Sequence, residues 1–182
     1  MSKIKDIKTT HVMPNELDKI PKNSDLILTT EIEKQSLRNY KIFVPKSHNR
    51  TYLYSNIIKK IEEKNKFGEV IVGVDPGKTI GLATLADDIV IQTAEYFTPL
   101  GVVKEIISIF FNIETDDFKI KIGHGGGEIR EEITSRLNKI FQNKVDINVI
   151  NERYTSKNQM QELRKVYSKH MAAAILIAKR GK

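Results

Sequence analysis

Two hydrophobic periods alternate along the chain beyond residue 68, and they predict a mixed α/β fold. The apolar run 70–75 ends at Asp75 and a tight turn, and further apolar runs follow at 80–86 and 89–95. An unbroken apolar run that ends in an acid is typical of a buried central strand with a carboxylate at its end. We therefore expect three strands joined as hairpins, with Asp75 at an edge of the sheet that faces solvent.

Helices and strands are then expected in alternation. Thr98-Pro99 provides an N-cap and a first helical residue, and the helix 100–111 is apolar on most sides, Phe111 included, which indicates burial against a sheet. The alternating strand 118–122 is expected to lie parallel to the first strand, because a helix separates it from the hairpin. The other expected elements are a helix with Ile129, Ile133, Leu137 and Ile140 on one face, a strand at 145–150 and a final helix at 166–180.

A weaker pattern of the same kind occupies the first 67 residues. Short strands at 25–30 and 40–44 flank a short helix at 31–38, and a longer helix follows at 52–66. A βαβα unit of this size has little core of its own, so we expect it to pack on the main domain. The predicted domains are residues 1–67, a basic arm with the small βαβα unit, and residues 68–182, the main domain.

Charge is distributed unevenly over the 182 residues, whose net charge is +7. Residues 1–68 carry +6, residues 69–152 carry −6 and residues 153–182 carry +7. An acidic centre between basic ends suits an enzyme that gathers carboxylates around a divalent metal and holds a polyanion with flanking lysines and arginines. A lysine-rich, solvated surface without such a role has the same totals.

The composition also bears on the cellular compartment. Cysteine is absent, which excludes disulfides and thiolate metal sites and favours a reducing environment. The N-terminus lacks an apolar signal core, and the longest apolar runs are far shorter than a membrane span. We therefore expect a cytoplasmic protein without a membrane partner.

The segment Gly73-Val74-Asp75-Pro76-Gly77, with Gly81 after it, resembles the first strand of the RuvC/YqgF-type Holliday junction resolvases of the ribonuclease H-like superfamily. Sugar kinases, actin-like ATPases and Hsp70 chaperones open a related fold with a similar segment, whose loop holds ATP phosphates. The resemblance covers about residues 69–180. It implies a mixed five-stranded sheet flanked by helices, with Asp75 as the first metal-binding carboxylate.

A second match follows the last expected strand. Asn151-Glu152-Arg153-Tyr154-Thr155-Ser156 is similar to an Asp-Glu-Arg-Leu-Thr-Thr segment of the YqgF-type proteins, which implies that Glu152 stands at the second catalytic position. Asn151 departs from the family aspartate. A plain surface turn also contains residues of this kind, but the match gains weight when it is joined to Asp75.

The third acid of the family is missing from the final helix. The helix resembles an Asp-x-x-Ala-Ala pattern in one of two ways: His170 stands where the acid is expected, or His170 matches a RuvC histidine and Ala173 its aspartate. The resemblance implies His170 as a third ligand of Mg²⁺ or Mn²⁺, or as the residue that orients the attacking water. Magnesium prefers oxygen ligands, whereas manganese accepts nitrogen more readily.

Glycine-rich backbone at 123–127 leads into a helix, and the free N–H groups of such a helix start suit a phosphate. RuvC has a glutamate at the end of the preceding strand. Glu128 is the nearest substitute here, and the helix dipole also explains an acid in a first turn. Cations and an aromatic ring gather at 45–52, which suits phosphate contact and base stacking. The residues expected to contact nucleic acid are Lys46, Arg50, Lys78, His124, Arg153 and Lys169.

Three functions are consistent with these observations. The first is a metal-dependent, structure-selective endonuclease that acts on branched DNA in recombination or repair, with Asp75, Glu152 and His170 as its site and, by resemblance, a homodimer. The second is a catalytically weakened or inactive nucleic-acid-binding protein of the same fold, which the missing acid motivates. The third is a nucleotide-binding module of the actin-like type, which is disfavoured because a complete member needs two such domains.

Overall fold

The computed structural model describes residues 8–13, 15–151 and 157–180. The chain divides into two compact units, one of residues 5–65 and one that begins at residue 66. The second unit contains the sheet, Asp75 and the final helix. Within the described residues, no helix is both long enough and apolar enough to cross a membrane.

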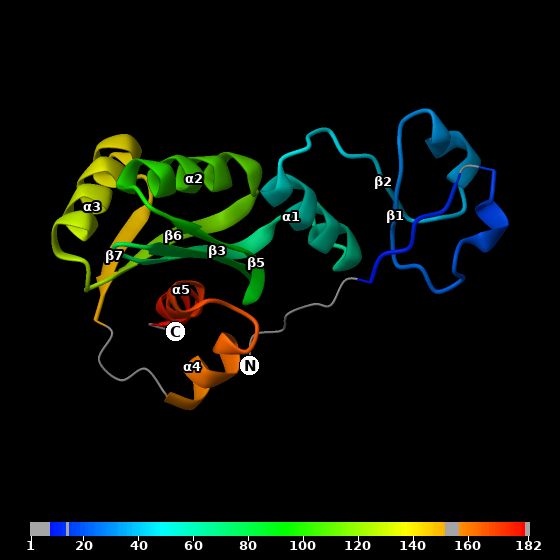
Figure 1. Ribbon diagram of the computed structural model, residues 1–182. Coiled ribbons are helices and arrows are strands. Elements are labelled where there is room, and N and C mark those ends of the chain that lie inside the picture. Colours follow the sequence, from blue (N-terminus) through cyan, green and yellow to red (C-terminus); the bar gives the residue numbers. More distant parts are fainter. Residues whose placement is uncertain (1–7, 14, 152–156, 181–182) are drawn as a thin grey trace. The chain divides into compact units, whose positions relative to one another are not determined.

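A five-stranded mixed sheet forms the larger unit (Figure 1). Its strands are β3 (Phe67–Asp75), β4 (Ile80–Ala86), β5 (Ile89–Tyr96), β6 (Thr115–Gly123) and β7 (Asp146–Ile150). In space they lie in the order β5-β4-β3-β6-β7, in which β4 is antiparallel to β3 and β5, and β6 is parallel to β3 and β7. This mixed order, with the first strand in the middle, confirms the ribonuclease H-like fold expected from the sequence.

Helices cover both faces of this sheet (Figure 1). One face carries α2 (Pro99–Asn112) and α3 (Gly127–Phe141), and the other carries α5 (Lys169–Lys179), beside which α4 (Lys157–Arg164) lies. A layer of helix on each side removes both faces of the central strands from water. This double burial is why the sequence of β3 is an unbroken apolar run and not an alternating one.

The strand β3 therefore presents different residues to its two layers. Val72 and Val74 have no exposed surface, and Ile71 packs in one cluster with Ala174 of α5. Successive side chains along a strand point to opposite faces of the sheet. Since Ile71 faces α5, Asp75, four residues further along the strand, is on the same face.

The expected cap of α2 is confirmed, because the Thr98 side chain accepts a hydrogen bond from the Gly101 amide at 3.1 Å. The burial expected for Phe111 is wrong, since this residue is 78% exposed. Phe111 follows the buried Ile109 by two positions, which corresponds to about 200° around the helix and turns its ring away from the sheet.

A similar correction applies to α3. Ile140, expected on the inner face, is 47% exposed, whereas Phe141 is 5% exposed. Ile140 is three residues after the buried Leu137, and Phe141 is four residues after it. A spacing of four residues keeps a side chain closer to the helix face of Leu137 than a spacing of three does.

The final helix begins later than the sequence pattern predicts. Helix α5 starts at Lys169, because the side chain of Ser168 accepts a hydrogen bond from the Met171 amide at 3.2 Å and caps the helix. The expected start at Val166 is therefore wrong, and the separate helix α4 that precedes it was not anticipated.

In the unit of residues 5–65, the described residues form mainly short elements. They are the 3₁₀ helices η1 (Leu17–Lys19) and η2 (Glu33–Leu37), the strands β1 (Ile27–Leu28) and β2 (Ile42–Phe43), and helix α1 (Arg50–Ile61). The two strands pair in parallel, in the expected order, but each is only two residues long. The expected α-helix at 31–38 is a 3₁₀ helix, because the Glu33 carboxylate accepts hydrogen bonds from the backbone and hydroxyl of Thr30 and closes a tight turn.

Candidate functional site

Asp75 ends the central strand β3 next to the start of α5. Its Oδ2 atom lies 3.3 Å from Nδ1 of His170, although the two residues are 95 positions apart in the sequence. The side chain of Asp75 is 18% exposed and that of His170 is 35% exposed, so both remain accessible to solvent or substrate. A carboxylate and an imidazole at this distance can share a proton or ligate one ion. This pair is the centre of the candidate site.

Two glycines allow α5 to approach the sheet this closely. A Cβ atom on Gly81 would lie 2.1 Å from the carbonyl oxygen of His170, and a Cβ atom on Gly73 would lie 2.1 Å from that of Ala174. No larger residue fits at either position without movement of the helix. The absence of a Cβ atom at Gly73 of β3 and Gly81 of β4 thus sets the distance between α5 and the sheet, and with it the position of His170.

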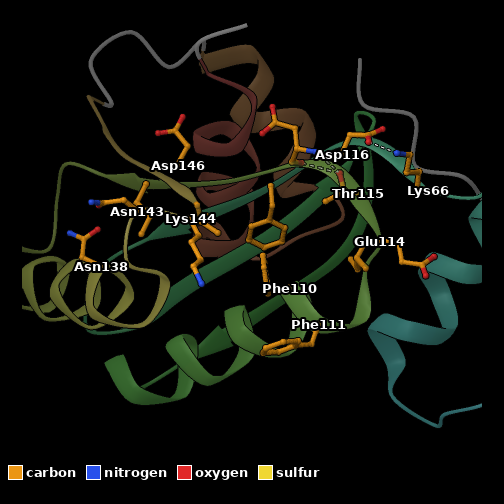
Figure 2. A pocket seen from close by; sticks show the side chains of 15 residues that line it. Lys66, Phe110, Phe111, Glu114, Thr115, Asp116, Asn138, Asn143, Lys144 and Asp146 are labelled. Atoms are coloured by element: carbon orange, nitrogen blue, oxygen red, sulfur yellow. Dashed lines mark hydrogen bonds and ion pairs between the residues drawn. The ribbon is translucent and has the colours of Figure 1, made fainter.

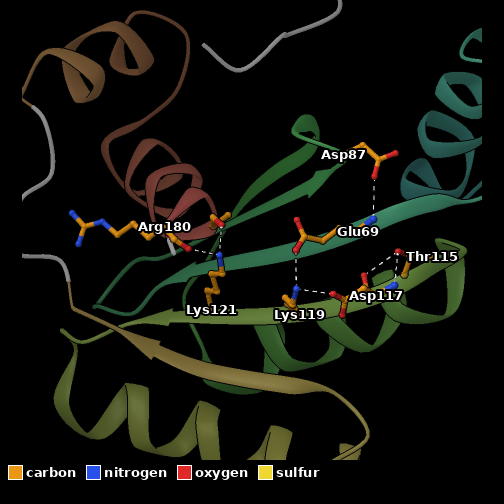
Figure 3. Close-up of polar contacts among 8 residues, drawn as sticks. Glu69, Asp87, Thr115, Asp117, Lys119, Lys121 and Arg180 are labelled. Atoms are coloured by element: carbon orange, nitrogen blue, oxygen red, sulfur yellow. Dashed lines mark hydrogen bonds and ion pairs between the residues drawn. The ribbon is translucent and has the colours of Figure 1, made fainter. Parts of the chain in front are cut away.

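The end of α5 is held from β6, as Figure 3 shows. The buried Lys121 donates hydrogen bonds from Nζ to the carbonyl oxygen of Ala178 at 3.0 Å and to that of Arg180. Ala178 lies in the last turn of the helix, where carbonyl groups generally lack a helical partner, and Arg180 directly follows the last helical residue. A cation at this end also interacts favourably with the helix dipole. Lys121 therefore anchors α5 at the end opposite to His170.

The same face of the sheet remains polar beside α5 (Figure 3). Lys119 of β6 forms ion pairs with Asp117 at 2.6 Å and Glu69 at 2.9 Å. Hydrogen bonds to Asp117 and Glu69 raise the pKa of Lys119, so the ammonium group is charged at any physiological pH. Lys119 and Lys121 alternate with apolar residues, and this alternation predicts the strand at 118–122. In the structure it corresponds to a polar face of the sheet that α5 only partly covers.

The glycine-rich loop before α3 packs directly against the turn that follows Asp75. A Cβ atom on Gly126 would lie 2.6 Å from the carbonyl oxygen of Pro76, and both Gly126 and Gly127 have positive φ values, 76° and 46°. Only glycine adopts this backbone readily and leaves room for the contact. The amino end of α3 is therefore next to the Asp75 turn.

The end of β7 reaches the same edge of the sheet. The His124 amide donates a hydrogen bond to the carbonyl oxygen of Ile150 at 2.9 Å, and the Arg180 side chain donates one to the carbonyl oxygen of Asn151. Glu152 and Arg153, the next two residues, lie outside the described residues. Their roles as second acid and as nucleic-acid contact stay predictions.

The other residues expected to contact nucleic acid fall into two groups. Lys78, in the turn after β3, His124, after β6, and Lys169, next to His170 in sequence, are exposed in the larger unit. Lys46 and Arg50 are exposed in the unit of residues 5–65. The exposure of all five is compatible with phosphate contact, and their role stays a prediction.

Glu95 is a residue of this region that the sequence analysis does not single out. Asp75 is paired with Gly81 on β4, and Gly81 with Glu95 on β5, so the three residues form one row across the sheet. The hydroxyl of Ser168 donates a hydrogen bond to Oε1 of Glu95. Asp75 and Glu95 thus lie on either side of the first turn of α5.

The described residues supply two candidate ligands for a divalent metal, the Asp75 carboxylate and the His170 imidazole. No group of three or more ligand-type side chains occurs among the residues that the structure describes. Magnesium commonly keeps several waters and is held by one or two carboxylates together with substrate phosphates. The pair fits an ion of this kind, with manganese better suited to the nitrogen ligand.

A cavity of about 920 Å³ lies at the opposite end of the sheet, at the amino ends of β6 and β7 (Figure 2). Phe110, Phe111, Asp116 and Asp146 line it, and the ring centroids of the two phenylalanines are 5.4 Å apart. Neither Asp75 nor His170 contributes to its lining. This cavity is therefore separate from the candidate site.

Comparison with known proteins yields distant structural similarities. No protein-family model matches the sequence, and no curated protein sequence matches it either. Among solved structures, RuvC of T. thermophilus in complex with a Holliday junction substrate aligns with 13% identity and a TM-score of 0.45, over 60% of this chain and 90% of that one. A chain of the PilM–PilN type IV pilus biogenesis complex aligns with 13% identity and a TM-score of 0.34, over 82% of this chain and 56% of that one. At these values neither alignment bears on function, and the fold assignment rests on the strand order and register of the chain itself.

Proposed function

We propose that the protein is a divalent-metal-dependent endonuclease selective for branched DNA. The observation that carries the proposal is the 3.3 Å approach between Asp75 Oδ2 and His170 Nδ1 at the end of the central strand of a ribonuclease H-like sheet. Glu152 is proposed as the second acid, because its segment follows β7 and β7 ends at the same edge.

The chemistry required is the in-line attack of water on a phosphodiester. A divalent ion bound at this site lowers the pKa of the attacking water and screens the charge of the phosphate. Asp75 provides the negatively charged ligand, and His170 provides either a nitrogen ligand or the group that orients the water. The amide groups at the start of α3 donate hydrogen bonds to phosphate oxygens, and the exposed Lys78 and Lys169 neutralise neighbouring phosphates.

A cleavage assay tests this proposal. Labelled four-way junctions, other branched substrates and linear duplex are incubated with the protein in magnesium and, separately, in manganese. We expect cleavage of branched DNA with manganese at least as strong as with magnesium, because an imidazole ligand suits manganese better. Absence of cleavage by the parent protein in both metals would contradict the proposal.

Three variants identify the residues responsible. Asp75→Asn removes the charge that holds the ion but keeps the shape of the side chain, so we expect folding and DNA binding to persist while cleavage is lost. His170→Ala is expected to lower cleavage more in manganese than in magnesium. Asp146→Asn, an exposed aspartate at the opposite end of the sheet, is the matched control and is expected to cleave like the parent. Cleavage by Asp75→Asn at the parental rate would place the reaction elsewhere.

A second candidate function is nucleic-acid binding without cleavage. Ala173, one turn after His170 in α5, stands where one alignment of the family pattern requires an acid, and this observation favours a weakened metal site. In that case the junction is bound tightly and in a salt-dependent manner, and Asp75→Asn binds like the parent. Junction affinity no higher than duplex affinity would argue against both functions.

A further inference from the structure

Glu95 lies on the same face of the sheet as Asp75, with one strand between them. Residues directly opposite each other in neighbouring strands point to the same face. The pairs Asp75–Gly81 and Gly81–Glu95 therefore direct both carboxylates toward α5. Two strand spacings of about 4.8 Å separate their backbones. Gly81, at the centre of the row, contributes no side chain to fill the gap.

The first turn of α5 fills this gap. A Cβ atom on Gly81 would come within 2.1 Å of the His170 carbonyl oxygen, which shows that the backbone of this turn lies directly over Gly81. His170 reaches to one side, toward Asp75, and Ser168 to the other, toward Glu95. The turn that carries His170 is thus held between two carboxylates.

The hydroxyl of Ser168 performs two tasks at once. It accepts a hydrogen bond from the Met171 amide at 3.2 Å, which caps α5, and it donates its own proton to Glu95. An ionised carboxylate only accepts hydrogen bonds, so Glu95 forces the hydroxyl proton away from the helix and leaves a lone pair for the Met171 amide. Its negative charge also lies near the positive end of the helix dipole.

We propose that Glu95 is a positioning residue for His170. Through Ser168 its carboxylate fixes the first turn of α5 over Gly81 and so keeps the imidazole at hydrogen-bonding distance from Asp75. Glu95 does not contact the reacting atoms in this arrangement. The kinetic part of the inference rests on the proposed function, whereas its structural part concerns the protein alone.

Three variants separate this role from a simple helix cap. Glu95→Met keeps the length of the side chain but removes the oxygen that accepts the Ser168 hydroxyl proton. Ser168→Asp retains a strong N-cap but puts a second carboxylate beside Glu95. In the double variant Glu95→Gln/Ser168→Asp, the glutamine amide donates to the new carboxylate, so the link is restored with the polarity reversed. Glu132→Met is the control, because it removes the acceptor of a 2.8 Å hydrogen bond that Arg136 donates on α3, on the other face of the sheet.

The first readout is cleavage of a four-way junction in manganese. We expect kcat of Glu95→Met and of Ser168→Asp to fall about tenfold to a hundredfold with KM nearly unchanged, the loss typical of a misplaced catalytic group. The double variant should recover to within about threefold of the parent, because positioning and not the charge of Glu95 itself is what matters. If Ser168→Asp cleaves like the parent, Ser168 acts only as a cap. If the double variant is as inactive as Glu95→Met, Glu95 acts directly and the inference is wrong.

The second readout needs no activity. The imidazole signals of His170, assigned among the four histidines with a His170→Gln variant, are recorded by NMR at one pH without metal or DNA. They are expected to move in both single variants, to return in the double variant and to stay in place in Glu132→Met. Unchanged His170 signals in Glu95→Met would overturn the inference even if the protein is a nuclease. Absence of cleavage by the parent would remove the proposed function and leave this test intact.

Discussion

Replacement of Gly81 by alanine tests how the close approach of α5 creates the candidate site. A Cβ atom at this position would lie 2.1 Å from the carbonyl oxygen, 2.4 Å from the carbonyl carbon and 3.0 Å from the Cβ atom of His170. Two of these are backbone atoms, so no side-chain rotation relieves the contact. The first turn of α5 has to retreat from the sheet.

The size of the effect follows from these distances. Ordinary contact begins at 3.4 Å, so the first turn must move by about 1.3 Å. Forced overpacking of this kind costs about 1–3 kcal/mol in free energy of unfolding, and we expect the upper end because the obstacle is backbone. The retreat also carries His170 away from Asp75, and a displacement of about 1 Å at a reacting group lowers a rate by about a hundredfold.

Two further glycine variants make the comparison sharp. Gly73→Ala produces an equal clash, 2.1 Å from the Ala174 carbonyl oxygen, but one turn further along α5 from His170. Gly77→Ala meets nothing closer than 3.4 Å and has room for the methyl group. Thermal unfolding should show that Gly81→Ala and Gly73→Ala lose similar stability while Gly77→Ala stays near the parent. The NMR signals of His170 should move furthest in Gly81→Ala.

One result would refute this reasoning. If Gly81→Ala unfolds at the parental temperature and its His170 signals coincide with those of the parent, the start of α5 does not rest on β4. The 3.3 Å contact between Asp75 and His170 would then lose its structural basis.

Three other measurements test separate parts of the molecule. Lys121→Met should cost about 1–3 kcal/mol in free energy of unfolding by denaturant, because the carbonyl groups of Ala178 and Arg180 lose their buried donor. If the protein binds DNA, Lys169→Ala should lower the slope of log affinity against log salt by about one and weaken binding to all sequences alike, and an unchanged slope would exclude a phosphate contact. The backbone amide of Thr30 first, and then hydroxyl hydrogen bonds, lower the pKa of Glu33 below its ordinary 4.5, so this contribution to stability is present above pH 4.5 and is lost as the pH falls through the lowered pKa. An NMR titration of Glu33 should show a midpoint below 4.5 that rises in Thr30→Val, and a midpoint at 4.5 in the parent would contradict the hydrogen bonds.

Much of the fold could be predicted because local patterns and burial agree in the sheet. The double burial of β3 requires a continuous apolar run, and the capping chemistry of Thr98 requires only neighbouring residues. The start of α5 could not be predicted in the same way. Its apolar pattern extends to Val166, and the hydroxyl of Ser168 decides where the helix begins.

The candidate site could be predicted in part. Asp75 stands out because a carboxylate follows a buried strand, and its meeting with His170 is what the resemblance to the resolvase family implies. The close fit of α5 at Gly81 and Gly73 could not be predicted. The local sequence around a strand glycine does not show whether a helix backbone packs against that glycine or whether the glycine only turns the chain.

The sequence by itself determined the central strand, the acid at its end and the alternation of elements around it, because these depend on periodicity and on neighbouring residues. Tertiary structure alone decided the place of Glu95. If the hairpin register continued without a shift from the turn between β4 and β5, Gly81 would be paired with Ala94. The side chain of Glu95 would then point to the opposite face of the sheet. The register shifts between Thr84 and Leu85, so that Gly81 is paired with Glu95 instead. One extra residue in a strand reverses the face of every side chain beyond it, and no local pattern in β5 marks where that residue falls.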